Sequence, residues 1–236
     1  AAWARAGRDA PADRGAATPA RGLPWLQCFT NRSAWLLAMY FGLINGGYTS
    51  LVAWLPHFYA QQGSTPQQAG AMLALMTVAQ VVAALAMPVL ARGRRDLRPW
   101  LFATLAAQLA GFAGLGLNAP GAAGIVALLG FGLGGSFALC MVLALDHLSD
   151  PRQAGTLAAF MQGLGFMIAA LAPFVTGWVR EQSGSFGFVW AYLGAIVLVL
   201  LPLTLCFDPR RYARATGGLF GARTPPPAPA PAAVAD

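Results

Sequence analysis

The stretch AGTLAAFMQGLGFMIAALAPFVTGWV, residues 154–179, decides the fold because it contains no charged side chain. A helix needs about 20 apolar residues to cross a hydrocarbon core about 30 Å thick. Five further stretches are similarly long and apolar, which gives six predicted membrane spans at 34–57, 68–91, 99–118, 121–145, 154–179 and 186–207. None of these stretches alternates polar and apolar residues as a barrel strand does, so each is predicted to be a helix.

The composition supports an all-α integral membrane protein. Of the 236 residues, 57% are hydrophobic and only 10% are charged, and the mean hydropathy is +0.58. A soluble domain carries about 25% charged residues, so this chain has too few to cover a water-facing surface. The net charge of +7 comes from arginines between the apolar stretches. It therefore marks membrane orientation, and no nucleic-acid partner is predicted.

The arginines also predict how the chain lies in the membrane, because basic residues in short loops stay on the cytoplasmic side. If the N-terminus is inside, the outer loops 58–67, 119–120 and 180–185 contain Arg180 as their one arginine, and every other arginine is on the inner side. Both termini are then cytoplasmic. The predicted domains are a cytoplasmic lead at 1–33 that links to a preceding half, a six-helix transmembrane half at 34–208, and a disordered Pro/Ala-rich cytoplasmic tail at 209–236.

Residues at the span ends agree with these boundaries. Thr65-Pro66-Gln67-Gln68 has the hydroxyl, the proline and the glutamine that start a helix. Asp150-Pro151 has the same start signal at the fifth span. Several tryptophans fall near span ends, where their rings anchor a helix at headgroup depth; they are Trp35, Trp54, Trp100, Trp178 and Trp190.

The sequence lacks the residues that an enzyme or a metal site would need. Its three cysteines are isolated, and its two histidines, His57 and His147, are predicted at opposite membrane surfaces. Ser136 lies deep in the fourth span, but an intramembrane protease would need a histidine at the same depth. We therefore expect no enzymatic activity, no metal and no cofactor.

Uncharged polar residues inside the spans are the candidates for a solute site, because such groups are costly unless they face a cavity or a neighbouring helix. The predicted solute-binding residues are Asn45, Tyr48, Gln80, Ser136 and Gln162. Asn45 and Gln162 are favoured because each carboxamide has four hydrogen-bonding sites to satisfy. Gln108 and the small residues Gly132, Cys140 and Ala144 are assigned to helix packing. The glycines at 130, 132, 134 and 135 are expected to let the fourth span bend and slide.

Three segments resemble one transporter family. They are Trp54-Leu55-Pro56, the segment from Gly63 to Gly70, and the segment from Met161 to Pro173 with Gly177 and Trp178 after it. Over residues 33–208 the chain resembles spans seven to twelve of a twelve-helix major facilitator superfamily transporter, in the branch of cyanate and nitroimidazole transporters. The basic loop 91–96 is similar to the superfamily's loop motif. The chain departs from the branch at Phe166, where a tyrosine is usual, and at Ile44-Asn45, where a Gln-Ser type pair is usual.

The resemblance implies a secondary carrier that works by alternating access in the bacterial inner membrane. Its partner would be the N-terminal six-helix half of the same carrier, and the solute would be a small organic molecule such as cyanate or a nitroheterocycle. In such folds spans seven, eight, ten and eleven face the cavity, while nine and twelve face lipid. The alternatives that remain open are a non-transporting membrane scaffold or accessory subunit and an inactive carrier fragment.

Overall fold

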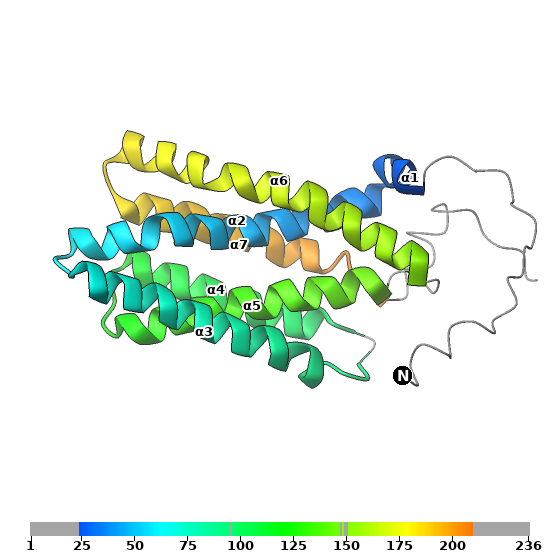
Figure 1. Ribbon diagram of the computed structural model, residues 1–236, viewed down its shortest axis with the longest axis horizontal. Coiled ribbons are helices and arrows are strands. Elements are labelled where there is room, and N and C mark those ends of the chain that lie inside the picture. Colours follow the sequence, from blue (N-terminus) through cyan, green and yellow to red (C-terminus); the bar gives the residue numbers. More distant parts are fainter. Residues whose placement is uncertain (1–23, 95, 147, 149–150, 210–236) are drawn as a thin grey trace, which may run out of the picture.

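The computed structural model describes residues 24–94, 96–146, 148 and 151–209, and within them all regular structure is helical (Figure 1). The helices are α1 (Pro24–Thr30), α2 (Arg32–Gln61), α3 (Pro66–Leu90), α4 (Arg98–Gly116), α5 (Ala122–Asp146), α6 (Pro151–Ser183) and α7 (Phe186–Thr204). The six helices α2 to α7 are long and apolar enough to cross a membrane. The predicted all-helical fold with six spans is therefore confirmed. His147, Asp150, most of the lead and nearly all of the tail lie outside the described residues.

Four helices form one layer and two lie behind it. The layer contains α6, α2, α5 and α3, with α3 crossing α5, and α7 and α4 lie behind α2 and α5 (Figure 1). The most extensive contacts join α3 to α5 and α2 to α6, followed by those of α4 with α5 and with α7. We call the exposed side of the four-helix layer the front face.

Local sequence fixes where the helices begin. The Thr65 hydroxyl accepts from the Gln68 backbone N–H at 3.3 Å, and the Gln68 side chain accepts from the Thr65 backbone N–H at 2.9 Å, so the predicted capping box is present. Before α4, the Asp96 carboxylate accepts from the Arg98 backbone N–H at 3.0 Å and pairs with its guanidinium at 2.8 Å. Hydrogen bonds from Arg98 hold the pKa of Asp96 below its usual value, although burial opposes the shift.

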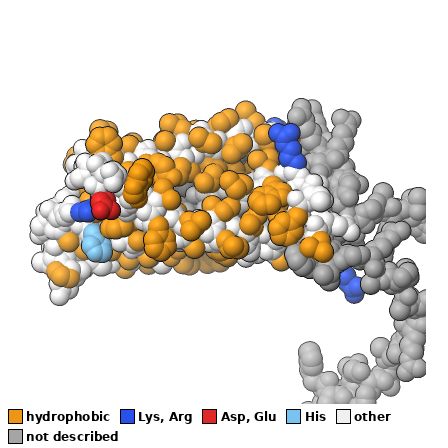
Figure 2. Space-filling model, turned by 90° about the horizontal axis from the view of Figure 1, so that it is seen from above, with side chains coloured by type: hydrophobic (Ala, Val, Ile, Leu, Met, Phe, Trp, Pro, Cys, Tyr) orange, Lys and Arg blue, Asp and Glu red, His pale blue; other side chains and the backbone are white. Residues whose placement is uncertain are grey.

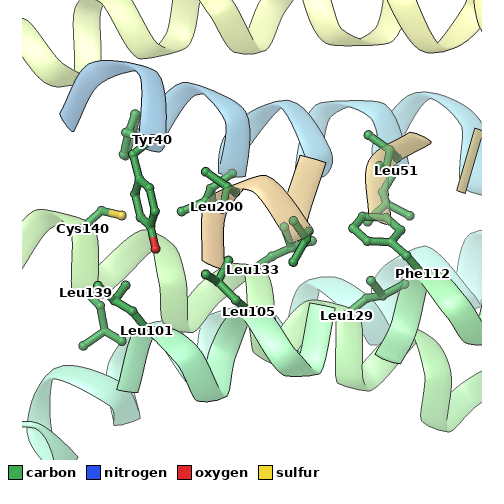
Figure 3. Close-up of a cluster of buried hydrophobic side chains, with 14 of the residues drawn as sticks. Tyr40, Leu51, Leu101, Leu105, Phe112, Leu129, Leu133, Leu139, Cys140 and Leu200 are labelled. Carbon is green, nitrogen blue, oxygen red and sulfur yellow. The ribbon is translucent and has the colours of Figure 1, made fainter. Parts of the chain in front are cut away.

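The core lies between the two layers. Leucines and aromatic rings from α2, α4, α5 and α7 fill it, and Figure 3 shows the Tyr40 ring beside Cys140 within this cluster. The Tyr40 hydroxyl is buried and is bonded to the Thr204 hydroxyl at 2.8 Å. This bond satisfies the polar end of a large aromatic side chain in an apolar interior. Tyr40 thereby fixes α2 against α7.

Glycines set the distance between neighbouring helices. A Cβ added at Gly134 of α5 would lie 2.0 Å from the backbone oxygen of Gln80 on α3, and one added at Gly130 would lie 2.1 Å from that of Met76. On the other side of the layer, a Cβ at Gly42 would lie 2.9 Å from the Ile168 Cβ. The α5 glycines were expected to let the helix bend and slide, which stays a prediction; in the structure Gly130 and Gly134 also allow two helix backbones to come into contact.

Charged side chains occupy the two ends of the bundle. Figure 2 shows an apolar belt between the ends, with basic, acidic and histidine side chains close together at the end away from α1. Most of the described arginines belong to the α1 end: Arg32, Arg92, Arg94, Arg98 and Arg152. Within the described residues the opposite end, which we call the far end, has Arg180 as its one basic residue. This asymmetry matches the distribution expected from the sequence.

Candidate solute site

A proline in α6 leaves a backbone carbonyl without its helical partner. Pro173 has no N–H, so the oxygen of Ala169 loses the bond that it would otherwise accept. Thr49 of α2 supplies the replacement, because its hydroxyl donates to Ala169 O at 2.7 Å. An unbonded carbonyl inside a membrane costs several kcal/mol. Thr49 therefore ties α2 to α6 at the point where α6 is weakest.

Further polar contacts follow between α2 and α6 toward the far end. The buried Thr176 hydroxyl bonds Ala172 O at 2.9 Å and lies 3.4 Å from the Ser50 hydroxyl. The Trp54 indole N–H donates to Pro173 O at 3.2 Å. Trp54 was predicted to be a membrane anchor; its position also lets it hold α6. These residues close the contact between the two helices and leave their front face to Asn45 and Tyr48.

Asn45 has hydrogen-bonding capacity to spare. Its amide nitrogen donates to Phe41 O one turn earlier, at 2.8 Å, and the residue is 7% exposed. Among the described residues, no group donates to its side-chain oxygen. Tyr48, three residues on, is partly buried, and Val52 after it is 39% exposed. This stripe gives the front face an apolar wall that contains one carboxamide near the middle of the 30-residue helix.

Gln162 lies at a different depth from Asn45. Gly46 faces Ala172 and Ala169 of α6, which puts the neighbouring Asn45 close to the level of Ala169. Gln162 precedes Ala169 by seven residues, or about 10 Å along a helix. A solute of a few atoms cannot contact both carboxamides at once, so the structure does not bring these two predicted residues together in one site.

Gln80 is farther from this pair. Its helix, α3, packs most extensively against α5, whereas α6, which carries Gln162, packs most extensively against α2. Its backbone oxygen packs against Gly134, and its side chain is partly exposed. The structure therefore places Gln80 against α5 and Gln162 on α6, on helices with different main packing partners.

Ser136 is directed away from the other candidates. It is fully buried between α4 and α5, donates to the Thr104 hydroxyl at 2.8 Å and accepts from the Gln108 amide at 2.9 Å. Gln108 also donates to Gly132 O at 3.2 Å, as its assignment to packing predicts. The hydroxyl of Ser136 is thus used in a helix–helix contact behind the front layer. We leave Ser136 out of the site.

Arg180 is a candidate that the search for deep polar residues missed. Its guanidinium carbon lies 4.4 Å from the centre of the Phe186 ring, and its Nε is buried without a hydrogen-bond partner. Within the described part of the chain, no carboxylate pairs with it. A cation held against an aromatic ring at the far end of the α2–α6 contact can attract an anion. The sequence did contain a signal for this candidate, because Arg180 is the one arginine in the predicted outer loops.

Among the described residues, the groups brought together are uncharged amides and hydroxyls, with the Arg180 cation at the far end. No group of three or more His, Cys, Asp or Glu side chains gathers into a metal site among the described residues. Phe166, where the family branch usually has a tyrosine, packs edge-on against Phe41 with ring centres 5.2 Å apart. The polar group that a tyrosine would carry is absent at this position.

Six helices that are long and apolar enough to cross a membrane, with uncharged polar side chains among them, are typical of a polytopic membrane protein. A model of the Major Facilitator Superfamily matches residues 1–173. The chain belongs to this superfamily, and its relatives include members of the cyanate and nitroimidazole branch.

Three curated relatives illustrate the similarity. The chain is 49% identical over 187 residues to the cyanate transport protein CynX of Escherichia coli (strain K12), covering 78% of this chain and 48% of that protein. It is 27% identical over 176 residues to the uncharacterized transporter YycB of Bacillus subtilis (strain 168), covering 73% and 43%. It is 25% identical over 175 residues to the 2-nitroimidazole transporter of Escherichia coli (strain K12), covering 73% and 44%. The chain spans about half the length of the curated relatives it matches.

Proposed function

We propose that these residues are the C-terminal six-helix half of a secondary carrier that moves a small organic solute by alternating access. The observation that carries the proposal is the Asn45 carboxamide, whose oxygen accepts no hydrogen bond from a described residue near the middle of the apolar helix α2. A polar group with unmet hydrogen bonds at that depth is expensive unless it meets a solute, water or a partner helix. Thr104, Ser136 and Gln108, behind the layer, satisfy one another instead.

A second half is proposed to cover the front face. Helices α3 and α6 leave large apolar side chains exposed while also carrying Gln80 and Gln162, which lipid would not solvate. Two halves rocking about a midplane site would enclose these amides in a polar cavity. A scaffold that binds a partner protein through the same face is the alternative, and a solute-uptake measurement distinguishes the two.

We favour a small anion as the solute, with cyanate first and a nitroheterocycle second. The names of two relatives indicate these solutes for those proteins. In this chain, Arg180 supplies positive charge at the far end, and the Asn45 and Gln162 amide groups supply N–H donors deeper in the bundle. An anion would meet these groups one after another on its way through the membrane.

The proposed orientation places the α1 end in the cytoplasm of a bacterial cell, with the protein in the inner membrane. The arginines at that end support it, since basic residues in short loops remain on the cytoplasmic side. A cysteine introduced at Gln62, between α2 and α3, should react with an impermeant maleimide added outside spheroplasts. Labelling only after lysis would reverse the orientation.

Uptake by the complete carrier tests the function. Radiolabelled cyanate uptake should fall when Asn45 and Gln162 are both replaced by alanine, while replacement of Gln67, exposed at the start of α3, should leave it unchanged. Unaltered kinetics in the double variant would remove both residues from the site.

An antibody to residues 209–236 should detect a polypeptide near twice 24.6 kDa in native membranes. A band at 24.6 kDa would instead require proof of pairing before any transport claim.

A further inference from the structure

The turn between α6 and α7 places an aromatic ring against the Arg180 side chain. Gly184, with a φ of +67°, has the left-handed conformation that favours glycine, and its backbone N–H donates to Arg180 O at 2.8 Å. Ser185 then starts α7 as its N-cap, because its hydroxyl accepts from the Gly187 backbone N–H at 3.1 Å. The turn brings the centre of the Phe186 ring to 4.4 Å from the guanidinium carbon of Arg180.

Phe186 is held in place as one of three packed rings. It is 5% exposed. Its ring stacks on Trp190 with centres 5.8 Å apart and meets Phe58 edge-on with centres 5.6 Å apart. Phe58 also meets Trp190 edge-on at 5.4 Å, which joins α2 to α7. We call Phe58, Phe186 and Trp190 the far-end ring cluster. The cluster gives the guanidinium a rigid aromatic support.

The two edges of the Arg180 guanidinium differ in access. Its Nε is buried and has no hydrogen-bond partner. Its two Nη atoms are not buried, and within the described part of the chain they form no hydrogen bond or salt bridge. The adjacent Glu181 is exposed and forms no salt bridge with Arg180. The Nη edge is therefore open to an anion, to which an arginine can offer two parallel N–H donors.

We propose that Phe186 is a positioning residue that holds Arg180 ready to capture the solute anion at the far end, an inference that rests on the anion role proposed above for Arg180. A long arginine side chain loses rotamer freedom when an anion fixes it. Because the cation–π contact with the ring already holds the guanidinium, less freedom remains to be lost on binding. Loss of the ring should therefore raise the anion concentration for half-occupancy by about two- to tenfold, as expected for ordering one such side chain.

Protection of Arg180 from phenylglyoxal, an arginine-selective reagent, tests the proposal in the complete carrier. Peptide mass spectrometry measures the rate of modification at increasing concentrations of thiocyanate, a linear monovalent anion like cyanate. Arg92, exposed at the other end, is the internal reference. Thiocyanate should slow the modification of Arg180 in wild type. Phe186→Leu should need about two- to tenfold more thiocyanate for half-protection, whereas Phe186→Tyr keeps the ring and should match wild type.

Phe112→Leu is the matched control, because it makes the same chemical change at a buried ring of α4 outside the far-end ring cluster. It should leave the thiocyanate concentration for half-protection unchanged. An equal shift in Phe112→Leu, or no shift in Phe186→Leu, would overturn the positioning role and leave anion capture by Arg180 intact. No protection in wild type would overturn both. The assay does not measure uptake, so a carrier that fails to transport cyanate would refute the proposed solute without changing this result.

Discussion

Replacement of Gly134 by alanine should separate α5 from α3. The added Cβ would lie 2.0 Å from the Gln80 backbone oxygen, while ordinary contacts begin near 3.4 Å, so the two backbones must move apart by about 1.4 Å (3.4 − 2.0). One turn away, a Cβ at Gly130 would lie similarly close to the Met76 backbone oxygen, so the α3 and α5 backbones are in close contact at both positions. Overpacking of this kind typically costs about 1–3 kcal/mol. At about 2–4 °C for each kcal/mol, Gly134→Ala should lower the melting temperature by several degrees.

Gly124→Ala is the matched control because it makes the same chemical change on the same helix. Its Cβ would meet nothing within 4 Å, and alanine is favoured over glycine in a helix by up to about 1 kcal/mol. The melting temperatures can be measured by fluorescence-detected size exclusion after heating. Gly134→Ala should lower the melting temperature, whereas Gly124→Ala should raise it or leave it unchanged. Equal melting temperatures for the two variants would refute the view that the α3–α5 contact is a backbone contact without slack.

Three further predictions concern separate parts of the molecule. Thr49→Val should lower stability by about 1–3 kcal/mol, because Ala169 O loses its donor, while Thr49→Ser should melt like wild type; a stable valine variant would contradict this. Arg180→Gln should raise the KM for an anionic solute with kcat little changed and should weaken the salt dependence of uptake; an unchanged KM would exclude Arg180 from anion capture. Asp96→Asn should cost about 0.2–1 kcal/mol at neutral pH, because it removes the charge of a partly exposed ion pair with Arg98 at the start of α4. Because the pKa of Asp96 is lowered by Arg98, wild type should keep this advantage above the ordinary carboxyl pKa and lose it as the pH falls through the lowered pKa; a difference in melting temperature that persists in strong acid would contradict it.

The membrane spans and the Thr65 helix cap could be predicted from the sequence, because both depend on residues that are close together along the chain. A run such as 154–179 has to be helical in lipid whatever surrounds it, and the groups of the capping box lie within four residues of one another. The charge asymmetry between the two ends followed from the same segmentation.

Rotation of each helix about its axis could not be predicted in the same way. Ser136 lies at the depth expected of a cavity residue, but only the packing of α4 against α5 turns its hydroxyl toward Thr104 and Gln108. The close packing of Gly130 and Gly134 against α3 was not predicted, because a glycine in a sequence does not show which backbone approaches it. The hydrogen bond from Thr49 to Ala169 joins residues 120 positions apart, so it could not be predicted from a local sequence pattern.

The helices differ in length in a way that bears on bilayer thickness. Helices α4 and α7 have 19 residues each, about 28 Å, whereas α2 has 30 and α6 has 33, about 45 and 50 Å. The rear pair thus matches a typical hydrocarbon core, and the front pair exceeds it by several turns. A thicker membrane would stretch beyond α4 and α7 while α2 and α6 still spanned it. Sensitivity to acyl-chain length should therefore originate at the rear pair.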